Sequence, residues 1–174
     1  MKKTLLLVIM LFISKSLIAQ NYKPFRVHIS GMYAAPTYTK AFSSGLGYSI
    51  EPAYAVDDNL AVGVRLEGAA LGVGSSLKDK IGVVASYTLT ADYFMFNEGN
   101  LRFFVGGGVG FFRTGTATTS STNDFVAGGD GWGFVPRVGI QLSHLRISAE
   151  YNSAPKNMSY FGLKAGVTIG GGKK

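Results

Sequence analysis

The sequence predicts an all-β fold, an eight-stranded, up-and-down, antiparallel β-barrel, and three observations lead to it. Glycine accounts for 24 of the 174 residues, roughly twice its usual share of about 7%. Aromatic residues make up 13% of the chain and charged residues only 16%, which is below the ~25% of typical soluble domains. Eight segments alternate between apolar and small or polar residues with the period of two that is typical of β-strands.

Each segment has one apolar face and one face of glycine, hydroxyl and charged side chains. In the first, Phe25 and Val27 alternate with Arg26 and His28. Each segment is close to the ~10 residues that a tilted membrane strand needs. In chain order, the expected strands are 23–33, 45–55, 59–68, 80–94, 102–115, 131–142, 145–152 and 160–171.

The connections between these segments alternate in length. Short turns are expected at residues 56–59 and 96–100 and at Ser143 and His144. The other connections are longer and more polar: 35–44, 71–80, 115–131 and the segment SAPKNM at 153–158. Short turns on the side of the termini and longer loops on the opposite side are typical of outer-membrane barrels.

Residues 1–20 have the layout of a secretory signal peptide. Lys2 and Lys3 precede an apolar run from Leu5 to Ile13, and small or polar residues follow, so cleavage is expected after Ala19 or Gln20. The run is about half the ~20 residues that span a bilayer as a helix. The mature barrel domain would then comprise residues 21–174.

Loss of this leader lowers the formal charge from +7 to about +4, because it removes three lysines and no acid. No run of Lys and Arg interleaved with aromatic residues remains, so we expect no nucleic-acid partner. The chain has no Cys, which excludes a disulfide framework.

Aromatic residues lie near both ends of the apolar face, as in the two interfacial girdles of a membrane barrel. This favours a transmembrane barrel with its apolar face outward. The alternative is a soluble, lipocalin-like binder with that face inward. The girdle residues are Phe25, Tyr54, Tyr93 and Phe103 near the turns and Tyr33, Phe111, Trp132, Tyr151 and Phe161 near the loops.

These features carry a family resemblance. The leader ending in IAQ, the eight strands, FFVGGGVGFF at 103–112 and FGLKAGVTIGG at 161–171 resemble small outer-membrane β-barrels of the OmpA-like and OmpX-like kind. The leader is similar to those of Bacteroidetes-type bacteria. The resemblance implies a location in the outer membrane of a Gram-negative bacterium and contact with the barrel assembly machinery. It specifies the fold and leaves the activity open.

The opposite face would place charged side chains inside the barrel. Counting residues outward from each predicted short turn gives the expected cross-strand pairs. Arg137 then lies opposite Glu150, Glu51 lies opposite Arg65, and Asp92 lies near Arg102. An eight-stranded barrel is only wide enough for side chains to fill, so we expect a plug of salt bridges; the alternative is a narrow anion-preferring channel. The interior charge network comprises Glu51, Arg65, Glu67, Asp92, Arg102, Arg137, Arg146, Glu150 and Lys164, and Arg26 also faces inward.

Few residues suggest catalysis. The glycines of residues 102–115 do not have the spacing of a phosphate-binding loop, and no helical pattern follows. His28 and Ser30 have the His-x-Ser spacing of a lipid A deacylase barrel, but both point inward on the first strand, whereas that family uses a late strand. His144 lies in a tight turn, and we expect no catalytic, cofactor or metal site.

The expected protein is therefore an outer-membrane barrel with a structural, adhesive or surface-binding role and no open solute pore. The alternative functions are a lipid A-modifying enzyme, a narrow anion channel and a soluble binder. We expect a monomer that contacts outer-membrane lipid and lipopolysaccharide, with loops 35–44, 71–80 and 115–131 available to a surface partner.

Overall fold

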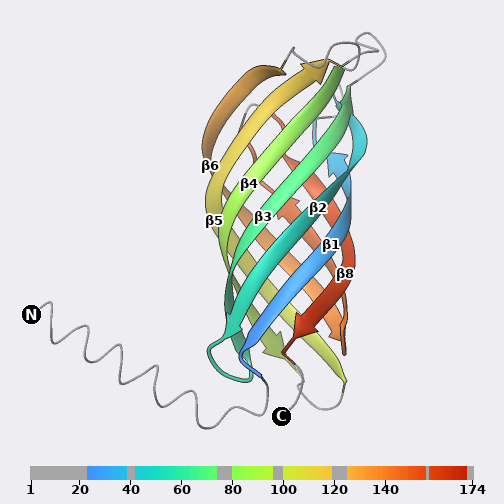
Figure 1. The fold of residues 1–174 in the computed structure, drawn as a ribbon. Helices are drawn as coiled ribbons and strands as arrows, with labels where there is room; N and C mark the ends of the chain where they lie inside the picture. Colours follow the sequence, from blue (N-terminus) through green and yellow to red (C-terminus); the bar gives the residue numbers. More distant parts are fainter. Residues whose placement is uncertain are drawn as a thin grey trace, which may run out of the picture.

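The computed structural model describes residues 23–38, 42–73, 80–95, 100–118, 125–155 and 157–171, and the expected signal peptide lies outside them. Within these ranges the chain forms a closed eight-stranded barrel (Figure 1). No helix in these ranges is long and apolar enough to cross a membrane. The strands are β1 (Phe25–Pro36), β2 (Phe42–Ala55), β3 (Leu60–Val73), β4 (Lys80–Met95), β5 (Leu101–Thr118), β6 (Phe125–Leu142), β7 (Leu145–Asn152) and β8 (Tyr160–Gly170).

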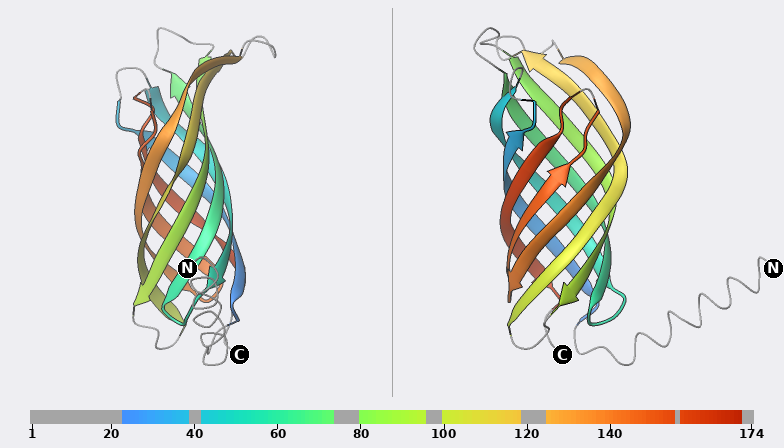
Figure 2. Two further views of the ribbon diagram at one scale, coloured as in Figure 1. Left: turned by 90° about the vertical axis from the view of Figure 1, so that its left-hand side faces the viewer. Right: turned by 180° about the vertical axis from the view of Figure 1, so that it is seen from behind.

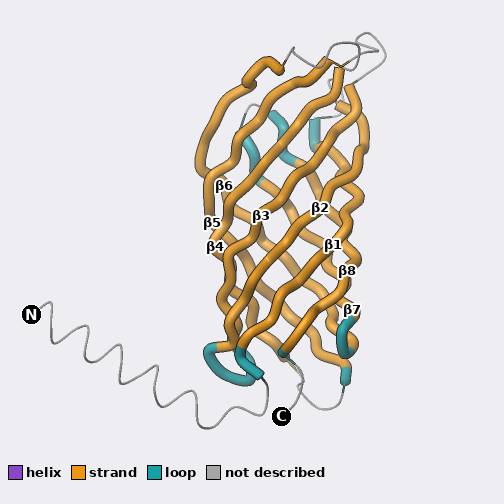
Figure 3. Tube along the Cα trace, in the orientation of Figure 1, coloured by secondary structure: helices purple, strands orange, loops and turns teal. Residues whose placement is uncertain are grey.

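Every strand pairs antiparallel with its neighbours in the chain, and β1 pairs with β8 to close the wall. The strands tilt strongly against the barrel axis in all three views (Figures 1 and 2). β1 begins and β8 ends at the end that also carries the β2–β3 and β6–β7 turns, which we call the turn end (Figure 3). The opposite end is the loop end. The up-and-down topology predicted from the sequence is confirmed.

The two-residue turn predicted between β6 and β7 is present. Leu142 pairs with Leu145 around it, and Ser143 adopts a positive φ of 52°. The resulting register sets Arg137 opposite Glu150, as counting residues from this turn predicts. Short turns with this backbone conformation fix the register of a hairpin and therefore decide which side chains share a face.

The β4–β5 register differs from the prediction. Asp92 pairs with Gly106. Arg102 precedes Gly106 by four positions on β5 and therefore lies nearer the turn end than Asp92 does. Three loops are also shorter than predicted, because strands extend into them. β1 and β2 extend into 35–44, and β3 extends to Val73. β5 reaches Thr118 and β6 begins at Phe125, so 115–131 is largely strand.

The apolar face points outward. Val62, Val105 and Ile147 are 38%, 44% and 38% exposed, whereas Arg65 and Glu150 are 0% and 4% exposed. A soluble barrel needs the reverse arrangement, because its surface must be polar. The predicted orientation of the two faces is therefore confirmed.

The interior at the loop end is apolar, which the sequence analysis did not anticipate. Inward side chains of six strands gather there with two from the β7–β8 segment and exclude charged groups from this part of the barrel. This loop-end plug comprises Met32, Ala34, Ala69, Leu71, Val84, Phe112, Val135, Ala154, Met158 and Tyr160, with Phe42 packed against it.

Candidate functional site

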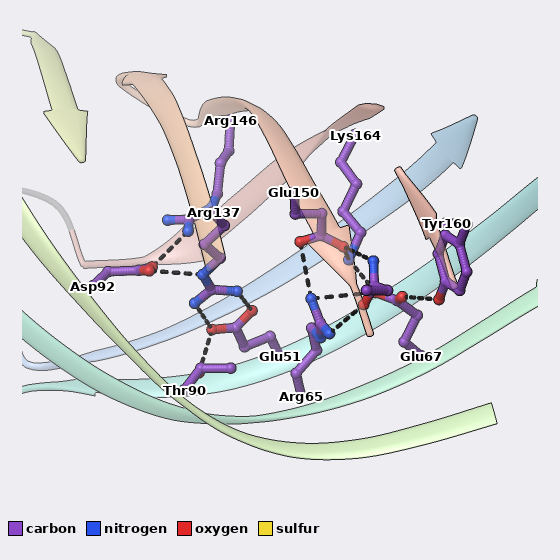
Figure 4. Close-up of polar contacts among 11 residues, drawn as sticks. Glu51, Arg65, Glu67, Thr90, Asp92, Arg137, Arg146, Glu150, Tyr160 and Lys164 are labelled. Atoms are coloured by element: carbon purple, nitrogen blue, oxygen red, sulfur yellow. Dashed lines mark hydrogen bonds and ion pairs between the residues drawn. The ribbon is translucent and has the colours of Figure 1, made fainter. Parts of the chain in front are cut away.

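Arg137 is the centre of one of two buried ion-pair clusters in the barrel interior (Figure 4). Its Nη2 and Nη1 atoms donate to the two carboxylate oxygens of Glu51 at 2.6 and 2.7 Å, and its Nε donates to Asp92 Oδ1 at 2.7 Å. Arg146 Nη2 donates to the other Asp92 oxygen at 2.5 Å, and the Thr90 hydroxyl donates to Glu51 at 2.8 Å. Every carboxylate oxygen in this cluster therefore accepts a hydrogen bond.

Arg65 organises the second cluster, nearer the loop end. Its Nη1 lies 2.9 Å from Glu150 Oε2 and 3.4 Å from Glu67 Oε2. Lys164 bridges the same two acids, with its Nζ 2.7 Å from Glu150 Oε1 and in contact with Glu67. The Tyr160 hydroxyl donates to Glu67 at 2.6 Å and joins this cluster to the loop-end plug. Figure 4 shows these contacts, and the side chains of Arg65, Glu67, Glu150 and Lys164 are at most 5% exposed.

The structure thus brings eight of the nine predicted network residues into two clusters but changes their partners. Arg137 binds Glu51 across the interior although Glu150 is its neighbour in register. Glu150 instead binds Arg65. The predicted contact between Asp92 and Arg102 is replaced by Asp92 contacts to two other arginines. Side chains in so narrow a barrel reach opposite strands as easily as adjacent ones.

A layer of arginine and phenylalanine fills the turn end. The guanidinium carbon of Arg102 lies 4.0 Å from the ring centroid of Phe94, and that of Arg26 lies 5.2 Å from the same ring. Arg146 lies 3.8 Å above Phe104, whose ring centroid is 5.6 Å from that of Phe94. Cation–π contacts of this length stabilise a guanidinium that is removed from water. Arg102 also donates to the Asp58 carbonyl in the β2–β3 turn at 2.6 Å.

Basic groups outnumber acids in the described interior, as the sequence predicts. Arg26, Arg65, Arg102, Arg137, Arg146 and Lys164 are buried, against Glu51, Glu67, Asp92 and Glu150. No group of His, Asp or Glu among the described residues could hold a metal ion.

His28 and Ser30 face the interior, at 3% and 9% exposure. His28 Nδ1 lies 2.8 Å from the Thr168 hydroxyl, and Glu51 is its partner in register on β2. Neither side chain reaches the lipid-facing surface where an acyl substrate would lie. His144 lies in the β6–β7 turn, and its Nδ1 is 2.9 Å from the Thr168 carbonyl.

The predicted girdle residues lie on the outside of the barrel in two rows. Phe25 and Tyr33 on β1, and Phe103 and Phe111 on β5, are eight positions apart. This spacing corresponds to roughly 26 Å along a strand and, for a strand tilted by about 40°, to roughly 20 Å along the barrel axis. An outward apolar band of ~25 Å is typical of outer-membrane barrels. Seven of the nine are exposed, and Phe111 and Tyr151 are half-buried by ring contacts.

The loop-end row is fuller than predicted on strands β5 to β8. Phe111 meets Trp132 edge-on with 6.3 Å between the ring centroids. Tyr151 contacts Phe161 at 5.0 Å and Phe134 at 6.3 Å. Phe134 was not assigned to the girdle, although its parity with Trp132 on one strand placed it on the same face. These five rings form an aromatic shelf at the loop end, where an interfacial girdle is expected.

Solved outer-membrane barrels share this architecture at low sequence identity. Neisserial surface protein A (NspA) aligns with 87% of the residues of this chain over 99% of its own length, at 14% sequence identity and a TM-score of 0.65. OprG from Pseudomonas aeruginosa aligns with 88% of this chain over 95% of its own length, at 12% identity and a TM-score of 0.56. Ail, the attachment invasion locus protein of Yersinia pestis, aligns with 86% of this chain over 99% of its own length, at 13% identity and a TM-score of 0.51. At such identities the likeness concerns the fold alone.

No protein-family model and no curated protein matches this sequence.

Proposed function

We propose that this chain is an integral outer-membrane β-barrel of a Gram-negative bacterium with a structural, adhesive or surface-binding role and no open solute pore. The observation that carries the proposal is the packing of the interior. Arginine–phenylalanine stacks, two ion-pair clusters and an apolar plug succeed one another from the turn end to the loop end. A solute would have to displace buried, mutually bonded charges to pass.

The outward face supports the membrane location. Apolar side chains between two aromatic rows favour hydrocarbon, and a closed barrel leaves no unpaired sheet edge within the bilayer. The barrels of similar fold include Ail, described as an attachment invasion locus protein and also solved with the heparin analogue sucrose octasulfate. Their architecture supports a surface role for this chain, in which residues at the loop end contact the partner.

Two other functions receive less support. The excess of buried basic groups would favour anions in a narrow channel, but these groups are bonded within a filled interior. A lipid A hydrolase would need His28 and Ser30 at the lipid-facing surface, whereas both are buried inside. We therefore propose that the chain is not an enzyme and acts as a monomer inserted by the barrel assembly machinery.

Fractionation and electrophysiology test the proposal. The full-length chain should reach the outer membrane, and the folded barrel should migrate differently in unboiled and boiled gel samples. In planar bilayers it should give no steady conductance under conditions where a porin control conducts. A band that is insensitive to heat would overturn the membrane barrel. A stable conductance that Arg137→Ser increases would instead establish a channel.

A further inference from the structure

Arg113 and Asp130 form an exposed ion pair directly above the aromatic shelf. Arg113 follows Phe111 by two positions on the outward face of β5, and Asp130 precedes Trp132 by two positions on β6. In the pairing of β5 with β6, Arg113 lies opposite Asp130 and Phe111 lies opposite Trp132. A charged pair therefore lies one step closer to the loop end than the ring contact between Phe111 and Trp132. In a membrane this step corresponds to the headgroup region of the outer leaflet.

The geometry of this pair leaves most of the guanidinium available. Arg113 Nε lies 3.3 Å from both oxygens of Asp130, whereas its Nη1 and Nη2 have no partner among the described residues. The Arg113 side chain is 63% exposed. Asp130 thus contacts the guanidinium only through Nε. The two terminal nitrogens, Nη1 and Nη2, remain available as a pair of hydrogen-bond donors, which we call the Arg113 fork. Such a fork matches the oxygens of a phosphate group.

Trp132 provides a second surface beside this fork. It is 76% exposed, the highest value among the large hydrophobic side chains described. Phe111 supports it from one edge and leaves much of the indole accessible. An exposed indole with an apolar body and a polar N–H suits the boundary between hydrocarbon and hydrated sugar.

The chain that follows β7 covers the backbone edge of β6 beside Trp132. β6 pairs with β5 along its length, but its pairing with β7 extends only from Leu142 to Arg137. The next residue, Pro136, has no N–H to donate, as is usual at a strand edge. Among the described residues, the only backbone bond to this edge beyond Pro136 runs from Ser153 N to the Phe134 carbonyl at 3.1 Å.

The N–H and C=O of Trp132 point to the same side as those of Phe134, because alternate residues of a strand share a direction. The segment that follows β7 lies along that side of β6, because a Cβ on Gly133 would lie 2.0 Å from the Ser153 carbonyl oxygen and one on Gly131 would lie 3.5 Å from Pro155. Residues 153–155 therefore cover this side of β6, and the exposed groups at this level are the Arg113 guanidinium and the Trp132 ring.

We propose that Arg113 and Trp132 bind the headgroup of a phosphorylated, acylated glycolipid of the lipid A type. The Arg113 fork binds a phosphate, and the Trp132 ring contacts a sugar ring. The acyl chains lie along the apolar face toward the turn end, beside Phe134 and Val138. The assignment rests on the proposed outer-membrane location and deepens it, since it names the lipid and its contacts.

The single tryptophan of the chain makes the site directly observable, because all tryptophan fluorescence arises from Trp132. The mature barrel is inserted into phosphatidylcholine vesicles, and lipid A is raised stepwise in the same membrane. We expect a saturable change in Trp132 emission with lipid A. Dephosphorylated lipid A should require about tenfold more lipid for the same change, because the charge-assisted hydrogen bonds are lost.

Arg113→Gln should weaken the response to lipid A about tenfold and remove the difference between the two lipids. Lys23→Gln is the matched control, because Lys23 is an exposed cation just before β1 at the opposite end. It should leave the titration unchanged. A gel of unboiled samples establishes that each variant is inserted. Failure of the wild-type chain to insert would refute the proposed function, whereas insertion without a Trp132 response would refute only the lipid site.

Three other outcomes would also overturn the lipid site. The first is an equal response to phosphorylated and dephosphorylated lipid. The second is an equal loss in Arg113→Gln and Lys23→Gln, which would indicate general electrostatic attraction. The third is full competition by millimolar inorganic phosphate, which would assign the fork to a free anion.

Discussion

Replacing Arg137 by Met tests whether the barrel interior is a closed, low-dielectric plug. The substitution keeps much of the side-chain volume but removes three hydrogen bonds of 2.6–2.7 Å to Glu51 and Asp92. Asp92 then retains Arg146, and Glu51 retains only the Thr90 hydroxyl among these contacts. Removing one partner of a buried ion pair costs about 3–5 kcal/mol, since the remaining charge is left in a poor solvent. We expect Arg137→Met to lower the free energy of unfolding by that amount.

The measurement is urea unfolding of the barrel in lipid vesicles, followed by Trp132 fluorescence and by gel mobility. Adding Glu51→Gln to Arg137→Met should recover at least half of the loss, because it removes the orphaned carboxylate. Arg113→Gln is the surface control, and its exposed pair with Asp130 should contribute about 0–1 kcal/mol. A loss below about 1 kcal/mol for Arg137→Met would mean that water screens the interior charges, and the argument against an open pore would fail.

Three further variants test other parts of the barrel. Phe94→Ala should cost about 3–5 kcal/mol in the same unfolding assay, because it empties a buried site under two guanidinium groups, whereas the outward Phe103→Ala should cost less. Gly139→Ala should destabilise the barrel by about 1–3 kcal/mol, because the added Cβ would lie 2.4 Å from the Ile147 carbonyl oxygen of β7. Gly31→Ala is the control and should be tolerated, because no atom lies within 4 Å of the added Cβ. Leu89→Arg on the lipid-facing surface should cost about 2–4 kcal/mol in vesicles and less in detergent; equal costs in both would contradict the membrane orientation.

The wall of the barrel could be predicted from the sequence because its rules are local. Alternation with a period of two decides the face of each residue, so Arg65 and Val62 were assigned correctly to opposite sides. The two-residue turn at Ser143 then fixed the register of one hairpin. The strand ends were less predictable, because Thr116 and Val126 in a polar segment pair only through the tertiary extension of β5 and β6.

The partners inside the barrel could not be predicted from pairwise register. Arg137 and Glu51 belong to β6 and β2, which are separated by several strands along the wall, yet they meet across the interior. Which strands face one another depends on the tilt and stagger of the closed barrel, and no single hairpin determines these. The loop-end plug was missed for a related reason. Phe112 and Val135 lie on different strands, and their contact with the other inward apolar residues at this end depends on the closure of the whole barrel.

The glycines of the barrel wall indicate why a ligand site is expected on the outer surface at the loop end and not in the barrel interior. A Cβ on Gly106 would lie 2.2 Å from Asp92 Oδ1, and one on Gly139 would lie 2.5 Å from the Phe104 ring. Large charged and aromatic side chains therefore occupy space that neighbouring positions of the wall leave empty. An interior fitted in this way leaves little freedom to evolve a ligand site without loss of stability. The outer surface at the loop end has no such constraint, because the Arg113 and Trp132 side chains are 63% and 76% exposed.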